Sequence, residues 1–437
     1  MKQLNPFKPI ENAPLIVFRV FFGFLFACET FGALLTGWVK DNFLLPDFTF
    51  SHIGMEWLQP LPGYGMVVYF CVMGVLGLLV MSGWYYRISI SLLTVLWAGV
   101  YFMQKTSYNN HYYLLMLVAL MMCFLPANQY ASVDAKRNPK LKSLSMPVWC
   151  AWVMILQISI VYFYATLAKF YPDWLDGTFT RNLFSTVTDN KTLLEVFGSP
   201  WFYLFIAYSG ILFDGLIVPA LMWKKTRNYA LIASLVFHLF NSITLKIGIF
   251  PYFALSFALF FYEPNSIRKI FLKRKPEFVS ADQSNGFASR RIFYLFFIPF
   301  FVIQLALPLR HYFIKGDVLW TEEGHRLSWR MMLRDREGYV DFKVIDKKTK
   351  QQLSYPVQYV LTRKQYQSLA TKPDMIWQMA QRIKKHFEKE GIEVSVFVDC
   401  MVSINGKNHK KLVNPKVDLA ASDWNYFGHD EWVLLYN

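Results

Sequence analysis

Charged residues are scarce in this sequence. Asp, Glu, Lys and Arg make up 17% of its 437 residues, whereas hydrophobic residues make up 54%. A soluble globular protein averages about 25% charged residues, so a large part of this chain must be hidden from water. The composition excludes an intrinsically disordered protein and a collagen-like fibre.

Cysteine is also sparse, and the common catalytic motifs are missing. The five cysteines form no Cys-x-x-Cys pair, and four of them lie in apolar runs, which excludes a disulfide framework and a cysteine zinc site. There is no Gly-rich phosphate loop, no His-Glu-x-x-His and no Gly-x-Ser-x-Gly, so the signatures of nucleotide binding, zinc peptidases and serine hydrolases are absent. We therefore predict no metal centre.

The apolar residues are concentrated in long runs. A helix needs about 20 residues to cross a bilayer. The first run follows Lys2 and Lys8, as a signal peptide would, but it continues for 26 residues without a small-x-small cleavage site, so we expect a retained helix. The eighth run is short for a full span, which leaves eight or nine crossings. The runs cover residues 14–39, 64–82, 88–103, 111–125, 147–168, 201–223, 228–245, 250–262 and 292–309.

The formal charge of +15 first suggests nucleic-acid binding, but the positions of the basic residues indicate membrane topology. With nine spans and a cytoplasmic N terminus, the inner loops hold 17 Lys and Arg and the outer loops hold 6. Basic residues are retained on the cytoplasmic side of membranes. We therefore expect no nucleic-acid partner, contact with membrane lipid, and a chain that lies outside the cytoplasm after Leu309: periplasmic or extracellular, or lumenal in a eukaryote. The basic run 268–275 is interpreted as a juxtamembrane anchor.

The composition changes after Arg310. Residues 311–437 hold 20 Lys and Arg and 16 Asp and Glu and contain no long apolar run. We therefore predict a transmembrane helical domain, residues 1–310, and an extracytoplasmic soluble domain, residues 311–437. The stretch 280–289, between the eighth and ninth predicted spans, resembles a cytoplasmic linker.

Patterning within the outer domain predicts both sheet and helix. Alternating apolar residues indicate strands, helical spacing ending before a glycine indicates a helix, and Asn405-Gly406 is a strong hairpin signal. The expected elements are a hairpin of strands 339–345 and 353–360, a helix 375–390 and a strand 392–404. The predicted fold is thus an α-helical polytopic membrane protein of about nine spans with a C-terminal α+β or β-rich domain.

Two polar residues stand at the outer ends of predicted spans. His111 begins the fourth span and Lys169 ends the fifth, so both are expected at the same outer level. A lysine shielded from water can act as a base, and an imidazole can orient it. The alternatives are that the lysine extends to the membrane surface and that the histidine caps its helix. The aromatic residues near the lysine in sequence are Tyr162, Phe163, Tyr164, Phe170 and Trp174.

Two further groups of polar residues are candidates for binding. His238 and Asn241 lie three residues apart in the seventh span and face the same way; they make either a structural hydrogen bond between helices or a cofactor contact. The segment from Trp320 to Gly338 combines Trp, His, Ser and Arg close to the last membrane exit. Its arginines can bind carboxylates in bidentate fashion, or the segment packs between domains.

Five stretches resemble the signature segments of the vitamin K-dependent gamma-glutamyl carboxylase family, and they occur in the family's order. They are KTSYNNHYYL, IVYFYATLAKFYPDW, FNSITLKIGIFPYF, EGHRLSWRMM and VSINGKNHKKLVNPKVDLAASDW. The chain is similar to short, bacterial-type members. Where animal members have two adjacent lysines, this chain has Ala168-Lys169; His325 replaces a Tyr and Arg334 replaces a His.

The resemblance implies an enzyme that converts protein glutamate to gamma-carboxyglutamate with vitamin K hydroquinone, O2 and CO2, releasing the quinone as its epoxide. Glutamate-containing proteins or peptides would be its substrates. It implies Lys169 as base with His111 assisting, since a neutral lysine can deprotonate a hydroquinone. The resemblance and the candidate binding residues together give a cofactor set of Asn110, Tyr164, His238 and Asn241. The implied substrate-binding residues are Trp320, His325, Ser328, Trp329 and Arg336.

Two other functions remain open from the sequence. The protein could oxidise the quinol to its epoxide without carboxylation. It could also be a non-enzymatic membrane anchor whose outer domain binds a partner, although no polar stripe recurs along several spans to line a pore.

Overall fold

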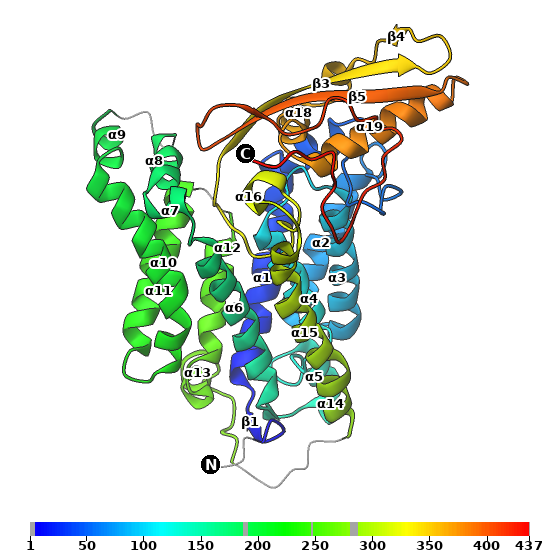
Figure 1. Cartoon of the computed structure of the whole chain (residues 1–437). Coiled ribbons are helices and arrows are strands. Elements are labelled where there is room, and N and C mark those ends of the chain that lie inside the picture. The colour runs from blue at the N-terminus through cyan, green and yellow to red at the C-terminus, as the bar shows by residue number, and fades with distance from the viewer. Residues whose placement is uncertain (1–4, 187–190, 246–247, 280–286, 437) are drawn as a thin grey trace.

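A bundle of apolar helices forms most of the protein, and a small sheet domain covers one end of it (Figure 1). The computed structural model describes residues 5–186, 191–245, 248–279 and 287–436. Strand β1 (Pro9–Glu11), near the start of the described chain, and the four-stranded sheet lie at opposite ends of the bundle. Most of the predicted linker 280–289 lies outside the described residues.

Within the described residues, seven helical segments are long and apolar enough to cross a membrane. They are α1 (Ala13–Leu35), α2 (Gly65–Ser82), α3 (Tyr86–Met103), α6 (Trp149–Ala168), α10 (Pro200–Met222), α11 (Arg227–Leu245) and the segment Ser289–Phe313. Two shorter apolar helical segments, α4 (Asn110–Met122) and Phe250–Phe260, occupy the predicted fourth and eighth spans. The polytopic helical fold is therefore confirmed, and every predicted apolar run is largely helical.

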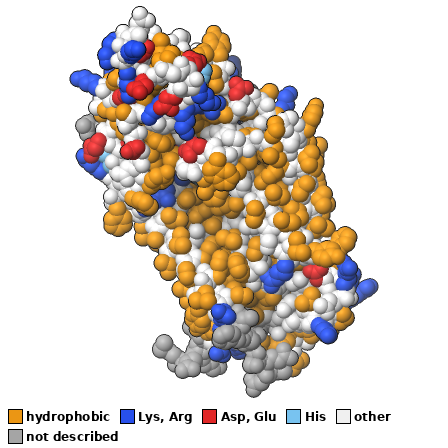
Figure 2. All heavy atoms as spheres, turned by 90° about the vertical axis from the view of Figure 1, so that its right-hand side faces the viewer, with side chains coloured by type: hydrophobic (Ala, Val, Ile, Leu, Met, Phe, Trp, Pro, Cys, Tyr) orange, Lys and Arg blue, Asp and Glu red, His pale blue; other side chains and the backbone are white. Residues whose placement is uncertain are grey.

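Short helices connect the long ones or interrupt them. On the membrane side these are η1 (Lys40–Leu44), α5 (Val133–Arg137), η2 (Pro139–Leu141), α7 (Pro172–Leu175), α8 (Thr178–Ser185), α9 (Lys191–Phe197), α12 (Phe250–Ser256), η3 (Phe257–Phe260), α13 (Pro264–Phe271), α14 (Phe287–Ile292), η4 (Phe293–Phe297), α15 (Ile298–Ala306) and η5 (Leu307–Phe313). Strands β1 (Pro9–Glu11) and β2 (Ser145–Pro147) pair antiparallel. A band of apolar side chains covers the bundle, with charged side chains gathered beyond it at both ends (Figure 2).

The C-terminal region is the predicted mixture of sheet and helix. Its antiparallel sheet has the order β4-β3-β5-β6, and β3 pairs with β5 from Arg336↔Ile404 to Asp346↔Val394. Asn405 and Gly406 both have positive φ, as their hairpin signal predicts. The elements are β3 (Arg336–Asp346), β4 (Gln352–Leu353), β5 (Val394–Ile404), β6 (Lys410–Lys411), α16 (Val318–Thr321), α17 (Val357–Val360), α18 (Arg363–Leu369) and α19 (Pro373–Glu388).

One predicted strand is wrong. The pattern over 353–360 predicts a strand, but only Gln352–Leu353 pairs with β3, and residues 357–360 form α17. Pro356 lies between them and has no N–H to donate to a neighbouring strand. The hairpin is thus present with a second strand of two residues.

Helices α1 and α2 approach closely at glycines, which gives a test of the packing. A Cβ at Gly23 would lie 2.4 Å from the backbone nitrogen of Met81 and 2.6 Å from the carbonyl oxygen of Gly77. We expect Gly23→Ala to destabilise the protein by about 1–3 kcal/mol, because backbone atoms must move apart. Thermal unfolding in detergent measures the change.

Gly32, on the same helix, is the matched control, because a Cβ there meets nothing within 4 Å. Gly32→Ala should be neutral or slightly stabilising, since alanine favours helix over glycine by about 1 kcal/mol. Equal effects of the two substitutions would contradict the close approach of α1 and α2.

Candidate active site

Lys169 follows directly after α6 and is buried, with 7% of its surface exposed. Its Nζ lies 2.5 Å from Oδ2 of Asp214 and donates a hydrogen bond to the carbonyl oxygen of Ala165 at 3.2 Å. The same nitrogen lies 5.2 Å from the centre of the Trp174 ring. Of the aromatic residues near it in sequence, Phe163 and Phe170 are instead exposed. The lysine is therefore covered by tryptophan and paired with an acid rather than enclosed by aromatic rings alone.

Asp214 is missing from the residues predicted from the sequence, although a signal for it exists. It is the one acidic residue within the otherwise apolar α10, and an ionisable residue inside a membrane span usually has a function. A buried ammonium and carboxylate compensate each other's charge. An ammonium group cannot accept a further proton, so Lys169 can accept one only in its neutral form. Asp214, whose Oδ2 lies 2.5 Å from Nζ, is the group placed to exchange a proton with it.

His111 lies against an aromatic ring. Its ring stacks on that of Phe250, with centroids 3.9 Å apart, and the centroid of Phe250 lies 6.2 Å from that of His238. His238 Nε2 is 3.0 Å from the hydroxyl of Tyr162, on α6. The structure thus places both candidate histidines at Phe250, and it shows no hydrogen bond or ion pair between His111 and Lys169 among the described residues.

The other residues predicted to bind a cofactor are more scattered. The Tyr164 hydroxyl donates to the carbonyl oxygen of Leu305 at 2.6 Å. Asn241 is half-buried one turn beyond His238, and no hydrogen bond to its side chain occurs within the described part of the chain. No group of three His, Cys, Asp or Glu residues in the described ranges is arranged to hold a metal ion.

The four-stranded sheet and its helices, at the end of the bundle opposite β1, are called the outer domain below. The segment 320–336 lies between this domain and the start of α4. The Asn110 side chain donates to the carbonyl oxygen of Arg330 at 3.0 Å, and the Tyr108 hydroxyl accepts from the backbone N–H of Leu327 at 2.8 Å. Trp329 is fully buried in the apolar core of the helix bundle, where its ring lies 4.8 Å from that of Tyr113. Residues predicted for cofactor and for substrate therefore meet at this junction.

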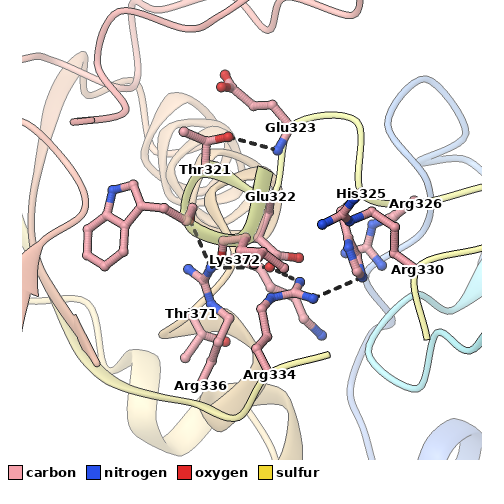
Figure 3. Close-up of polar contacts among 12 residues, drawn as sticks. Thr321, Glu322, Glu323, His325, Arg326, Arg330, Arg334, Arg336, Thr371 and Lys372 are labelled. Atoms are coloured by element: carbon pink, nitrogen blue, oxygen red, sulfur yellow. Dashed lines mark hydrogen bonds and ion pairs between the residues drawn. The ribbon is translucent and has the colours of Figure 1, made fainter. Parts of the chain in front are cut away.

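The carboxylate of Glu322, which is only slightly exposed, pairs with the arginines of this segment (Figure 3). Glu322 forms ion pairs with Arg334 and Arg336, the second at 3.2 Å. Burial would raise the pKa of Glu322, but the charges of Arg334 and Arg336 outweigh it and hold that pKa well below its usual value. His325 Nε2 lies 3.4 Å from an Arg334 nitrogen. Burial and the charge of Arg334 lower the pKa of His325, which is therefore neutral.

Several donors of this cluster are buried without a hydrogen-bond partner. They include Nε of Arg330 and of Arg334, Nε and Nη2 of Arg336, and Nδ1 of His325. Unsatisfied buried donors are rare in native proteins and indicate a ligand or an ordered water. Because most of these donors are cationic, a carboxylate is the chemistry that fits them.

Lys372, at the start of α19, belongs to the same cluster (Figure 3). Burial and the charge of Arg326 lower the pKa of Lys372 to about 7. We therefore expect competitive acetylation of the purified protein to show Lys372 reacting with a midpoint near pH 7. Lys348, which is exposed, is the control for the general reactivity of a lysine in this domain. Equal reaction midpoints for the two lysines would contradict the effect of burial and of Arg326 on Lys372.

Two residues predicted to bind substrate have structural contacts. Trp320 Nε1 donates to the carbonyl oxygen of Leu434 at 2.6 Å, and its ring is buried in the core of the outer domain. Ser328 Oγ donates to the carbonyl oxygen of Gly324 at 2.6 Å. Both side chains thus donate their hydrogen bonds to backbone carbonyl groups of the protein itself.

A cleft of about 470 Å³ lies between the helix bundle and the outer domain, bordered by the residues on either side of Lys169. Arg330 and His311 line it, together with Trp320. The hairpin turn of the outer domain forms another part of its wall: Asn405 Nδ2 and Lys407 Nζ donate to Asp173 at 2.8 and 2.7 Å. The outer domain thus holds the chain segment that follows Lys169.

Comparison with known protein families covers both parts of the chain. Residues 7–265, more than half of the chain, match the HTTM domain, and residues 289–437 match the lumenal domain of vitamin K-dependent gamma-carboxylase. No solved structure matches the chain. With the buried lysine, the arginine-rich segment and the cleft between the two parts, these matches show that the chain belongs to the vitamin K-dependent gamma-carboxylase family.

Proposed function

We propose that this protein carboxylates glutamate side chains of a protein or peptide at the γ position, coupled to oxidation of vitamin K hydroquinone to its epoxide. The observation that carries the proposal is the cleft between the two parts of the chain. Ala168 and Phe170, the sequence neighbours of Lys169, form part of its wall, and Arg330 forms another part. The proposed base thus lies directly behind the wall of a cavity that a carboxylate-binding group also lines.

The residues around His111 fit a quinone. Phe250 and His111 form an aromatic stack within the helix bundle, and no hydrogen bond occupies the ring nitrogens of His111 among the described residues. A flat ring with two polar oxygens suits stacking together with an imidazole donor or acceptor. When bound, the hydroquinone supplies the reducing equivalents consumed by O2 and, through that reaction, a base strong enough to remove a γ-proton of glutamate.

The chain's own residues have three tasks in this proposal. Lys169 Nζ accepts a proton, and Asp214 compensates the charge of the resulting ammonium. The unpaired arginine donors of the segment 320–336 bind the glutamate carboxylate. The apolar bundle and Trp329 exclude water from the junction, which protects a strong base from being quenched.

The same proposal assigns an orientation. Residues 1–310 span the membrane with the N terminus in the cytoplasm, and residues 311–437 face the opposite side. The support is the excess of basic residues on the predicted inner loops and the match to a lumenal domain. The protein substrate would then reach the cleft from outside the cytoplasm.

The test is fixation of labelled CO2. Purified protein in lipid nanodiscs, supplied with vitamin K hydroquinone, O2, labelled bicarbonate and a glutamate peptide, should transfer label to the peptide only when the hydroquinone is present. Formation of epoxide without labelled peptide would favour a quinol epoxidase instead. No turnover of the hydroquinone at all would favour a non-enzymatic anchor.

A further inference from the structure

A second cleft lies on the outer part of the molecule, with a volume of about 930 Å³. It separates the loop 43–63, which leads from η1 to α2, from the exposed face of α19. None of its lining residues also lines the cleft beside Lys169. The chemistry proposed above therefore leaves this cleft unexplained.

The wall formed by the loop 43–63 lies next to the ends of two membrane helices. Its apolar residues include Leu44, at the end of η1, and Leu61, whose side chain lies against Gly65 at the start of α2. Trp57 and Tyr64 of the same connection are 78% and 81% exposed. Exposed Trp and Tyr beside the end of a membrane helix are typical of the headgroup layer of a bilayer. This wall of the cleft is thus mostly apolar and lies at the membrane boundary.

The opposite wall is basic. Arg382 and Lys385 on α19, and Lys389 directly after its last residue, line the cleft and are spaced three and four residues apart. None of the three has an acidic partner among the described residues, and the guanidinium of Arg382 lies 3.5 Å from the centre of the Phe48 ring. Figure 2 shows charged side chains gathered directly above the apolar band on this side of the molecule.

The acidic residues of the cleft belong to the loop wall. Glu56 accepts hydrogen bonds from Gln378 Nε2 at 2.9 Å and from the backbone N–H of Gly54 at 3.0 Å, so it is already occupied. Asp47 is exposed. Neither acid forms an ion pair with Arg382, Lys385 or Lys389 among the described residues, so these cations remain available to a ligand.

We infer that this cleft binds the headgroup of an anionic phospholipid of the outer leaflet. The order of its walls matches a lipid: the apolar wall adjoins the bilayer, and the cations lie beyond it, where a phosphate would be. An acidic polypeptide would also satisfy the cations, but it has no need of an apolar wall at the membrane boundary. Basic pockets beside membrane helices bind lipid phosphates in this way.

The experiment uses the full chain in nanodiscs made from equal amounts of phosphatidylcholine and phosphatidylglycerol. After exchange into detergent, mass spectrometry measures the phospholipids retained per protein. The wild type should retain phosphatidylglycerol in preference to phosphatidylcholine. The triple variant Arg382→Gln, Lys385→Gln, Lys389→Gln should lose that preference, by about fivefold per charge removed.

The matched control removes three charges from the same domain, away from the cleft: Lys347→Gln, Lys348→Gln, Lys350→Gln. These residues are exposed in and beside the turn between β3 and β4, and their loss should leave lipid selectivity unchanged. Equal loss in both triple variants, or no preference in the wild type, would overturn the inference. A third outcome would overturn it in favour of a peptide site: unchanged lipid selectivity in the α19 variant together with loss of binding to a polyglutamate peptide.

Discussion

Lys169→Ala is expected to lower the rate of labelled CO2 fixation by about 10²- to 10⁴-fold, the usual contribution of a positioned general base. The residue is buried, paired with Asp214 and adjacent to the cleft between the two parts of the chain. Alanine removes the proton acceptor and leaves the Asp214 carboxylate without its partner. The measurement is the initial rate with hydroquinone and a glutamate peptide, compared at equal amounts of folded protein.

Epoxide formation measured in the same assay should fall in parallel. The proposed proton transfer at Lys169 precedes both products, so a variant that lost fixation and kept epoxidation would place the lysine after quinol oxidation. The control is Lys224→Ala, which also breaks a Lys–carboxylate pair, with Glu263, but an exposed one. That variant should keep wild-type rates, and undiminished fixation in Lys169→Ala would remove Lys169 from the mechanism.

Glu322→Gln should destabilise the protein by about 3–5 kcal/mol at neutral pH. Glu322 is the shared acidic partner of Arg334 and Arg336, and removing one member of a buried ion pair leaves its partners uncompensated. Unfolding by heat or denaturant in detergent measures the loss. Glu337→Gln, an exposed acid on β3 with no ion pair among the described residues, is the control and should change stability by less than about 0.5 kcal/mol.

The same variant has a predictable pH dependence. The pKa of Glu322 in the folded protein lies well below its unfolded value of about 4.3. Its contribution to stability is therefore complete above pH 4.3 and is lost as the pH falls toward the folded value. The difference between wild type and Glu322→Gln should shrink below about pH 4. A difference that stayed constant with pH would indicate a packing defect instead of a lost charge.

The architecture followed from patterns that are local in sequence. Apolar runs of about 20 residues placed the helices, since the bilayer imposes that length on any span. Asn405-Gly406 marked its hairpin because both positions need positive φ. The strand predicted over 353–360 is wrong because Pro356 has no N–H to donate to a neighbouring strand, so this edge strand is short.

The candidate site depended on contacts between residues far apart in the chain. Lys169 and Asp214 are 45 residues apart, and Asn110 and Arg330 are 220 apart. Position in the sequence placed His111 and Lys169 at the same depth in the membrane, but two residues at the same depth can lie on different sides of a helix bundle. Phe250 from another helix contacts the histidine, and Asp214 contacts the lysine.

By itself, the sequence determined that this is a multi-span membrane protein with a charged C-terminal domain, because burial in lipid and exposure to water select opposite compositions. It also indicated the family through five ordered stretches. Only the tertiary structure decided which carboxylate pairs with Lys169 and that Trp329 of the segment 320–336 is buried in the helix bundle. It also decided that Arg334 and Arg336 pair with Glu322. Such pairings depend on how helices and loops pack, and side chains separated by tens or hundreds of residues meet only once the chain has folded.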